Sequence, residues 1–215
     1  IIGQKKIINS KVLIVGVGGL GCPVADLLAR AGIGIIGVID FDKVNLSNIQ
    51  RQTLYTTKDI GKFKVNVIKK KLNLINKEVR VKIYNKKADD KNLKKIVKKY
   101  DIVVDGSDNF KTKFLLNKYS LEFRKKLIVG AISKFDGHIF SFNFNKKKMP
   151  CLKCFYQTEP SDQFLNCESE GILGSTANIV GGIQANEVLK TVLGIENNLK
   201  SNIFILDFLN LNFRK

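Results

Sequence analysis

The stretch KVLIVGVGGLG, residues 11–21, decides the fold of this chain. Residues 11–16 form a short apolar run rich in β-branched side chains, which is typical of a strand buried in a parallel sheet. Gly16, Gly18, Gly19 and Gly21 follow in a G-x-G-x-x-G pattern, and residues 20–31 have helical periodicity. Such glycines let the backbone approach phosphates, and the helix N-terminus offers free N–H groups and a positive dipole end. The unit therefore predicts a nucleotide site, the alternative being a tight turn without a ligand.

Outward from this unit, strands and helices alternate along the whole chain. We expect further strands at residues 35–40, 79–84, 101–105, 127–131, 137–144 and 203–208, and further helices at 62–76, 89–99, 109–123 and 172–193. This order predicts an α/β fold with a doubly wound, mainly parallel Rossmann-like sheet, helices on both faces and an antiparallel extension after residue 135. We expect residues 1–215 to form a single nucleotide-binding domain that is truncated at both ends. The first residue, Ile1 in place of Met, indicates that residues are missing before it.

The composition narrows the class of protein. The formal charge is +18, from 37 Lys plus Arg against 19 Asp plus Glu. This charge indicates either a basic face for an acidic partner or polyphosphate, or a lysine-rich composition with solvated charge runs. Basic motifs interleaved with aromatic residues are absent from the sequence, so nucleic acid is not the expected partner. Because the sequence has neither a signal peptide nor an apolar run of roughly 18 residues, we expect a cytoplasmic protein.

Acidic residues follow the second expected strand. Asp40 closes it, and a carboxylate at this place accepts hydrogen bonds from ribose hydroxyls in dinucleotide and nucleotide sites. Asp42 lies close by and is expected either at the nucleotide or as a turn or capping residue. These features fit NAD as well as ATP.

Three cationic or amide side chains then favour ATP: Asn48, Arg51 and Lys64. Fixed cations offset the charge that accumulates on phosphoryl oxygens and on departing pyrophosphate. Asp108, after the fourth expected strand, is a candidate ligand for Mg²⁺. Each residue alone has another interpretation, with Lys64 a surface lysine, Asn48 a turn residue and Asp108 an N-cap. Together they predict attack on an α-phosphate.

The chain resembles a known family over nearly its whole length. The matching segments are VGVGGLGCP (15–23), DFDKVNLSNIQRQ (40–52), GKFK (61–64), DGSDN (105–109), the pair Cys151 and Cys154, and NCESEGILG (166–174). They resemble the MoeB/ThiF-type adenylyltransferases of molybdopterin and thiamine biosynthesis, relatives of the ubiquitin-activating enzyme. The resemblance implies that ATP is surrounded by Gly19, Asp40, Asn48, Arg51, Gln52, Lys64, Asp108 and Asn109.

The resemblance also implies a reaction and its partners. A small ubiquitin-like sulfur-carrier protein ending in Gly-Gly would be adenylated by MgATP, with Arg51, Lys64 and Asp108 as catalytic residues. The helix at 172–193 would help to form a homodimer. The family has an arginine before the first strand that reaches the partner subunit's ATP, whereas the first arginine here is Arg30. The rival hypotheses are an NAD-dependent Rossmann oxidoreductase and a catalytically inactive partner subunit.

The cysteines carry separate predictions. Cys151 and Cys154 have C-x-x-C spacing, which suits one tetrahedral Zn²⁺ with two further ligands. The family has a second such pair near its C-terminus and this sequence has none, so a redox dithiol and two incidental thiols stay as alternatives. Some members of the family form a thioester or acyl-disulfide on a cysteine at the place of Cys167, so the resemblance implies a candidate nucleophile in this polar loop. In other members adenylation suffices and this cysteine is dispensable. We expect Cys22 to be a packing residue and His138 to be structural.

Overall fold

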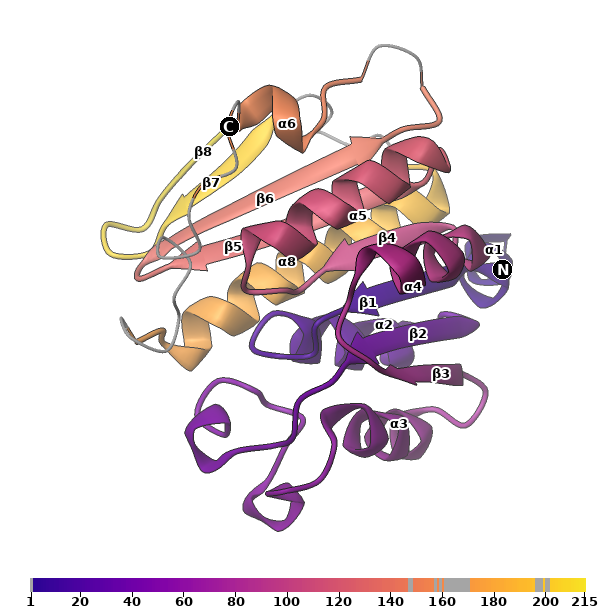
Figure 1. The fold of residues 1–215 in the computed structure, drawn as a ribbon, viewed down its shortest axis with the longest axis vertical. Helices are drawn as coiled ribbons and strands as arrows, with labels where there is room; N and C mark the ends of the chain where they lie inside the picture. The colour runs from indigo at the N-terminus through magenta and orange to yellow at the C-terminus, as the bar shows by residue number, and fades with distance from the viewer. Residues whose placement is uncertain are drawn as a thin grey trace.

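The computed structural model describes residues 2–146, 149–156, 158, 160, 171–195, 199 and 202–215. Its centre is a sheet with the strand order β3-β2-β1-β4-β5-β6-β7-β8 (Figure 1). The strands are β1 (Lys11–Val15), β2 (Ile35–Asp40), β3 (Arg80–Asn85), β4 (Ile102–Asp105), β5 (Lys126–Ser133), β6 (Asp136–Asn143), β7 (Ile203–Asp207) and β8 (Asn212–Arg214).

The sheet has a parallel and an antiparallel part. The strands from β3 to β5 pair in parallel, while β6, β7 and β8 are each antiparallel to the strand before them. The predicted antiparallel extension after residue 135 is therefore confirmed. The order reverses between β1 and β4, because the chain passes from β1 outward to β3 and then returns to β4. In open α/β sheets, ligands bind beyond the carboxyl ends of the strands at such a reversal.

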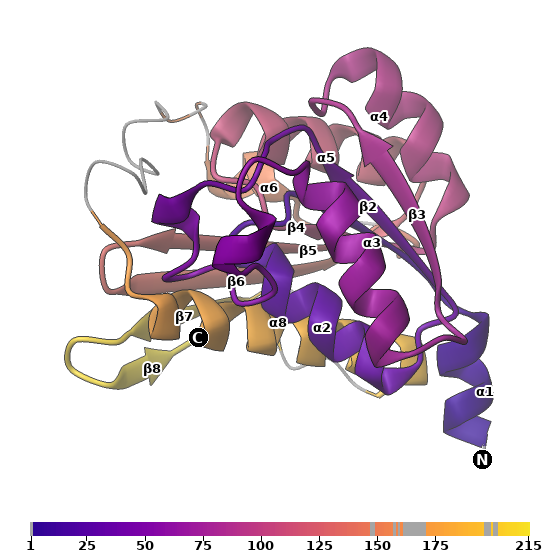
Figure 2. The same cartoon turned by 90° about the horizontal axis from the view of Figure 1, so that it is seen from below.

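Helices cover both faces of the sheet (Figure 2). The helices are α1 (Ile2–Asn9), α2 (Gly21–Ala31), α3 (Lys64–Ile75), α4 (Asp90–Ile96), α5 (Phe110–Glu122), α6 (Leu152–Phe155) and α8 (Gly174–Leu193). One face of β1, with Val12 and Ile14, shares a core with α2, α3 and α8. The opposite face, with Leu13 and Val15, shares a core with α4 and α5. The doubly wound arrangement with two buried faces confirms the expected fold class.

Sequence analysis did not predict helix α1, helix α6 or strand β8. Helix α1 buries none of its side chains. It is attached by two side-chain hydrogen bonds, from Lys6 Nζ to Leu193 O (2.9 Å) and from Gln4 Nε2 to Ala31 O (3.2 Å), and its partly buried Ile7 packs against the core. Strand β8 closes a short hairpin with β7 at the edge of the sheet. None of the helices in the described part of the chain is long and apolar enough to span a bilayer.

Candidate functional site

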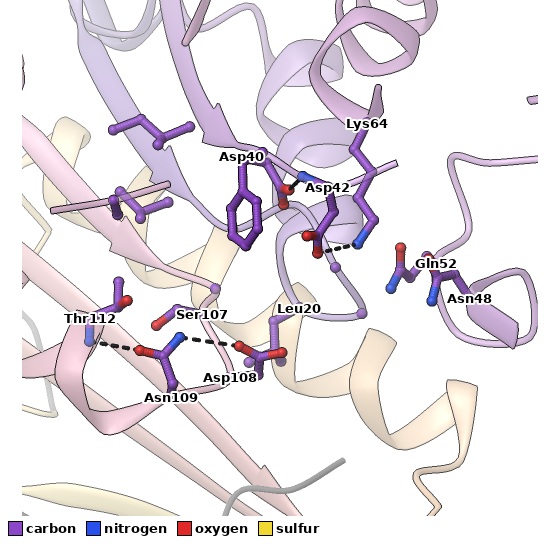
Figure 3. Close-up of a pocket in the computed structure, with 18 of the residues that line it drawn as sticks. Leu20, Asp40, Asp42, Asn48, Gln52, Lys64, Ser107, Asp108, Asn109 and Thr112 are labelled. Atoms are coloured by element: carbon purple, nitrogen blue, oxygen red, sulfur yellow. Dashed lines mark hydrogen bonds and ion pairs between the residues drawn. The ribbon is translucent and has the colours of Figure 1, made fainter. Parts of the chain in front are cut away.

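A cavity of about 360 Å³ opens at the strand-order reversal, beyond the carboxyl ends of β1, β2 and β4. Small-molecule sites in proteins commonly have volumes of roughly 300–1,000 Å³. Almost all of the predicted nucleotide residues line it (Figure 3): Gly16, Gly18, Gly19, Asp40, Asp42, Asn48, Arg51, Gln52, Lys64, Asp108 and Asn109. Gly21, the remaining one, lies behind the loop and does not line the cavity.

The glycine loop has a backbone that only glycine tolerates at two points. Gly16 adopts a φ of +85°, in the left-handed region. A Cβ on Gly21 would lie 2.0 Å from the Gly16 carbonyl oxygen. Within the described residues, the amides of Gly18, Gly19 and Leu20 have no acceptor. Free amides in a loop that opens a helix form a ready anion site.

Asp40 anchors the loop. It is nearly buried, and its Oδ2 accepts from Val17 N (2.9 Å) while its Oδ1 accepts from Asp42 N (2.8 Å). Burial raises the pKa of this carboxyl, and the Lys64 ammonium and the two amide hydrogen bonds oppose the rise in part. An ionised carboxylate has about four acceptor positions, so two remain for hydroxyl groups of a ligand.

Lys64 is the first residue of α3 and is only 5% exposed. Its Nζ lies 3.1 Å from Asp42 Oδ2, whose side chain is half exposed at the cavity (Figure 3). Among the described residues this is the only hydrogen bond of the Lys64 ammonium, which has three donors. A buried lysine facing a cavity therefore keeps donors for a polyanion.

The segment after β2 supplies the amides and the guanidinium. A short 3₁₀ turn, Leu46–Asn48, is capped by Asn45, whose N–H donates to Asn48 Oδ1 (3.1 Å). Arg51 Nη1 donates to Ser47 O (3.0 Å), and its other donors have no acceptor in the part of the chain that the structure describes. Gln52 is 3% exposed, and its Oε1 has no hydrogen-bond partner among the described residues. A buried oxygen without a partner in a cavity wall can accept from a donor group of a ligand or from water.

Asp108 and Asn109 lie across the cavity, in the turn from β4 to α5. Asp108 is exposed, and its Oδ1 accepts from Asn109 Nδ2 (3.2 Å). Asn109 is the N-cap, because its Oδ1 accepts from Thr112 N (2.9 Å). The capping alternative for Asp108 is therefore wrong. Its other carboxylate oxygen accepts from no described residue and could take a cation.

Sequence analysis missed several residues of the cavity. Lys113, which is 1% exposed, donates to Asp105 Oδ2 (3.0 Å), Ser107 O (2.8 Å) and Gly130 O (2.8 Å). Lys86 and Lys87, just after β3, and Phe41, just after β2, also line the cavity, with Lys87 Nζ 5.7 Å from the Phe41 ring centre. The only sequence signal was their position just after strands.

The three described cysteines, Cys22, Cys151 and Cys154, do not line this cavity. Cys151 Sγ and Cys154 Sγ are 3.8 Å apart at the start of α6. In the described ranges there is no group of three His, Cys, Asp or Glu side chains that would hold a metal. Cys167 falls outside the described residues. Cys22 is fully buried, as expected of a packing residue.

Comparisons with known proteins place this site in context. A model of the ThiF family matches residues 2–215. The sulfur carrier protein adenylyltransferase of Thermus thermophilus is 38% identical over 99% of this chain and 80% of its own length. A probable molybdopterin-synthase adenylyltransferase of Gracilaria tenuistipitata is 37% identical over 99% of this chain, which spans only 59% of that relative. A crystal structure of Escherichia coli MccB with ATP is similar over 99% of this chain and 65% of its own, with a TM-score of 0.86 and 26% identity.

Proposed function

Since the chain belongs to the ThiF family, we propose that it is an ATP-dependent adenylyltransferase for a ubiquitin-like sulfur-carrier protein. The observation that supports this most is one cavity that joins a glycine loop with free amides to two cations, Arg51 and Lys64. The names of the relatives favour a carrier of molybdopterin biosynthesis. An NAD oxidoreductase has no use for these two cations after the second strand.

In the proposed reaction, the C-terminal carboxylate of the carrier attacks the α-phosphorus of ATP. A carboxylate-to-phosphorus bond forms, the bond from the α-phosphorus to the bridging oxygen breaks, and pyrophosphate leaves. No general base is required, because a carboxyl group with an ordinary pKa is already ionised near pH 7. The products are an acyl-adenylate, which sulfur can later attack, and pyrophosphate.

Each site residue has a role that its geometry permits. The amides of Gly18 and Gly19 hold phosphate oxygens, and the free acceptor positions of Asp40 hold the ribose hydroxyls. Arg51 and Lys64, both of which keep donors without an acceptor among the described residues, offset the negative charge that develops on pyrophosphate. The exposed carboxylate of Asp108 would hold Mg²⁺, which would neutralise phosphate charge there.

Other parts of the proposal rest on fewer observations. The sulfur separation of Cys151 and Cys154 matches the ~3.8 Å expected for two thiolates on one tetrahedral Zn²⁺, from Zn–S bonds of about 2.3 Å. The described residues supply no third ligand, so zinc enters no step. Covalent catalysis by Cys167, a homodimer through α8 and a cytoplasmic location stay predictions.

The test is ATP–pyrophosphate exchange with carriers of molybdopterin and of thiamine biosynthesis, each ending in Gly-Gly. We expect exchange that depends on the carrier and is lost in Arg51→Ala. Arg30→Ala is the matched control, because Arg30 is exposed and pairs with Asp26 away from the cavity. Exchange that is absent from the wild-type protein despite bound ATP would support the inactive-partner hypothesis instead.

A further inference from the structure

Val17, in the middle of the glycine loop, is held on both sides by buried side chains from other segments. Its N–H donates to Asp40 Oδ2 (2.9 Å). Its carbonyl oxygen accepts from Tyr55 Oη (2.9 Å) and from Cys22 Sγ (3.3 Å). Val17 and Cys22 are fully buried and Tyr55 is 3% exposed. The loop conformation is thus fixed from the core, not only by its own glycines.

The peptide plane makes this contact relevant to the ligand. The Val17 carbonyl and the Gly18 N–H belong to one planar trans peptide, so they point in opposite directions. Tyr55 holds the carbonyl toward the core. The Gly18 N–H, which has no acceptor in the described structure, therefore points to the side of the cavity that Gly18 lines.

Tyr55 also links two parts of the site. Its N–H donates to Gln52 O (3.0 Å), and the Gln52 N–H donates to Asn48 O (2.9 Å). Tyr55, whose side chain holds the glycine loop, is thus also the last residue of the turns that carry Asn48, Arg51 and Gln52. The hydroxyl connects the anion-binding amides with the cationic segment across the cavity wall.

We propose that Tyr55 is a positioning residue whose hydroxyl aims the Gly18 N–H at a phosphate of the bound nucleotide, an inference that rests on the proposed function. Burial raises the pKa of Tyr55, so the hydroxyl stays a donor at physiological pH. Cys22, a weaker donor, does not replace it.

The experiment compares the dissociation constants of MgATP and adenosine by calorimetry in the wild-type protein and in Tyr55→Phe. We expect Tyr55→Phe to weaken ATP binding roughly fivefold, the weight of one neutral hydrogen bond. Adenosine binding stays unchanged, because adenosine has no phosphate. A purely structural role would weaken both ligands alike and would overturn the inference.

Tyr100→Phe is the matched control. Tyr100 is 1% exposed, and its hydroxyl is bonded to the Tyr84 hydroxyl (3.0 Å) on the other side of the sheet from Tyr55. In Tyr100→Phe we expect the ratio of the dissociation constants of MgATP and adenosine to equal that of the wild-type protein. The inference is contradicted if this ratio changes equally in the two variants, or if it does not change in Tyr55→Phe. A wild-type protein that binds no MgATP contradicts the proposed function itself.

Discussion

Lys113 Nζ lies 3.0 Å from Asp105 Oδ2, and the two side chains are 2% and 0% exposed. The Lys113 ammonium also donates to Ser107 O and Gly130 O. Asp105 Oδ1 in turn accepts from the Ser107 amide (2.9 Å) and hydroxyl (2.6 Å). The pair therefore fixes the turn between β4 and α5, on which Asp108 and Asn109 lie.

Removing the ammonium of Lys113 should destabilise the fold. Loss of one partner of a buried ion pair leaves an uncompensated charge and costs about 3–5 kcal/mol. We expect Lys113→Met to lower the free energy of unfolding by this amount in urea denaturation. Lys118→Met, on the same helix, breaks an exposed pair with Asp90 and should change little. An equal loss of unfolding free energy in the two variants would show that the buried ion pair contributes no more to stability than the exposed one.

Lys64→Met should impair the chemical step. Removal of one charge-stabilising donor from an active site commonly costs about 10²–10³-fold in kcat. We expect a loss of this size in carrier-dependent pyrophosphate exchange. Lys62→Met is the control, because Lys62 is 58% exposed at its side chain and pairs with Asp59. Activity close to wild type in Lys64→Met would remove this residue from the mechanism.

Gly21→Ala should disturb the glycine loop from behind. The added Cβ would lie 2.0 Å from the Gly16 carbonyl oxygen, so the loop must shift. We expect a lower melting temperature and weaker ATP binding. Gly182→Ala is the control, because the nearest atom to its added Cβ is Leu27 Cδ1 at 3.9 Å. This variant should be more stable than the wild-type protein by about 0.5–1 kcal/mol, since alanine is favoured over glycine in a helix interior. A Gly21→Ala protein with normal ATP affinity would refute the close packing.

Binding of the ribose should depend on pH through Asp40. Burial raises the pKa of this carboxyl above its ordinary value of 3.8, so protonation begins at a higher pH than in an exposed aspartate. The protonated form loses acceptor positions, and adenosine affinity should fall as pH is lowered from 7 toward the raised pKa. Asp40→Asn should bind more weakly at pH 7 and lack this decline. Parallel pH profiles for the two proteins would exclude Asp40 as the ribose acceptor.

Much of the fold follows from local patterns. The apolar run of β1, the glycines after it and the helical period of α2 lie within 21 residues, residues 11–31. For this reason the parallel sheet, the cavity and the placement of Asp40 at a strand end were predictable. The same holds for Arg51 and Lys64, whose segment matched known family motifs.

Other features depend on contacts between distant residues. In the sequence, Lys113 is indistinguishable from the other basic residues of a chain with 37 Lys plus Arg. Its hydrogen bond to Gly130 O becomes visible only when α5 is packed against β5. Tyr55 reads as a loop aromatic until the glycine loop is placed beside it. Helix α1 could not be predicted from an apolar face, because none of its residues is buried.

The central claim is transfer of an adenylyl group to a carrier carboxylate. The most direct measurement incubates the protein and a Gly-Gly carrier with ATP labelled on either the α- or the γ-phosphate, and follows label on the carrier. The account predicts that the α-label appears on the carrier and the γ-label only in released pyrophosphate. With Arg51→Ala we expect no label on the carrier and no labelled pyrophosphate. Label from the γ-phosphate on the carrier, or no carrier-bound label although ATP binds, would contradict it.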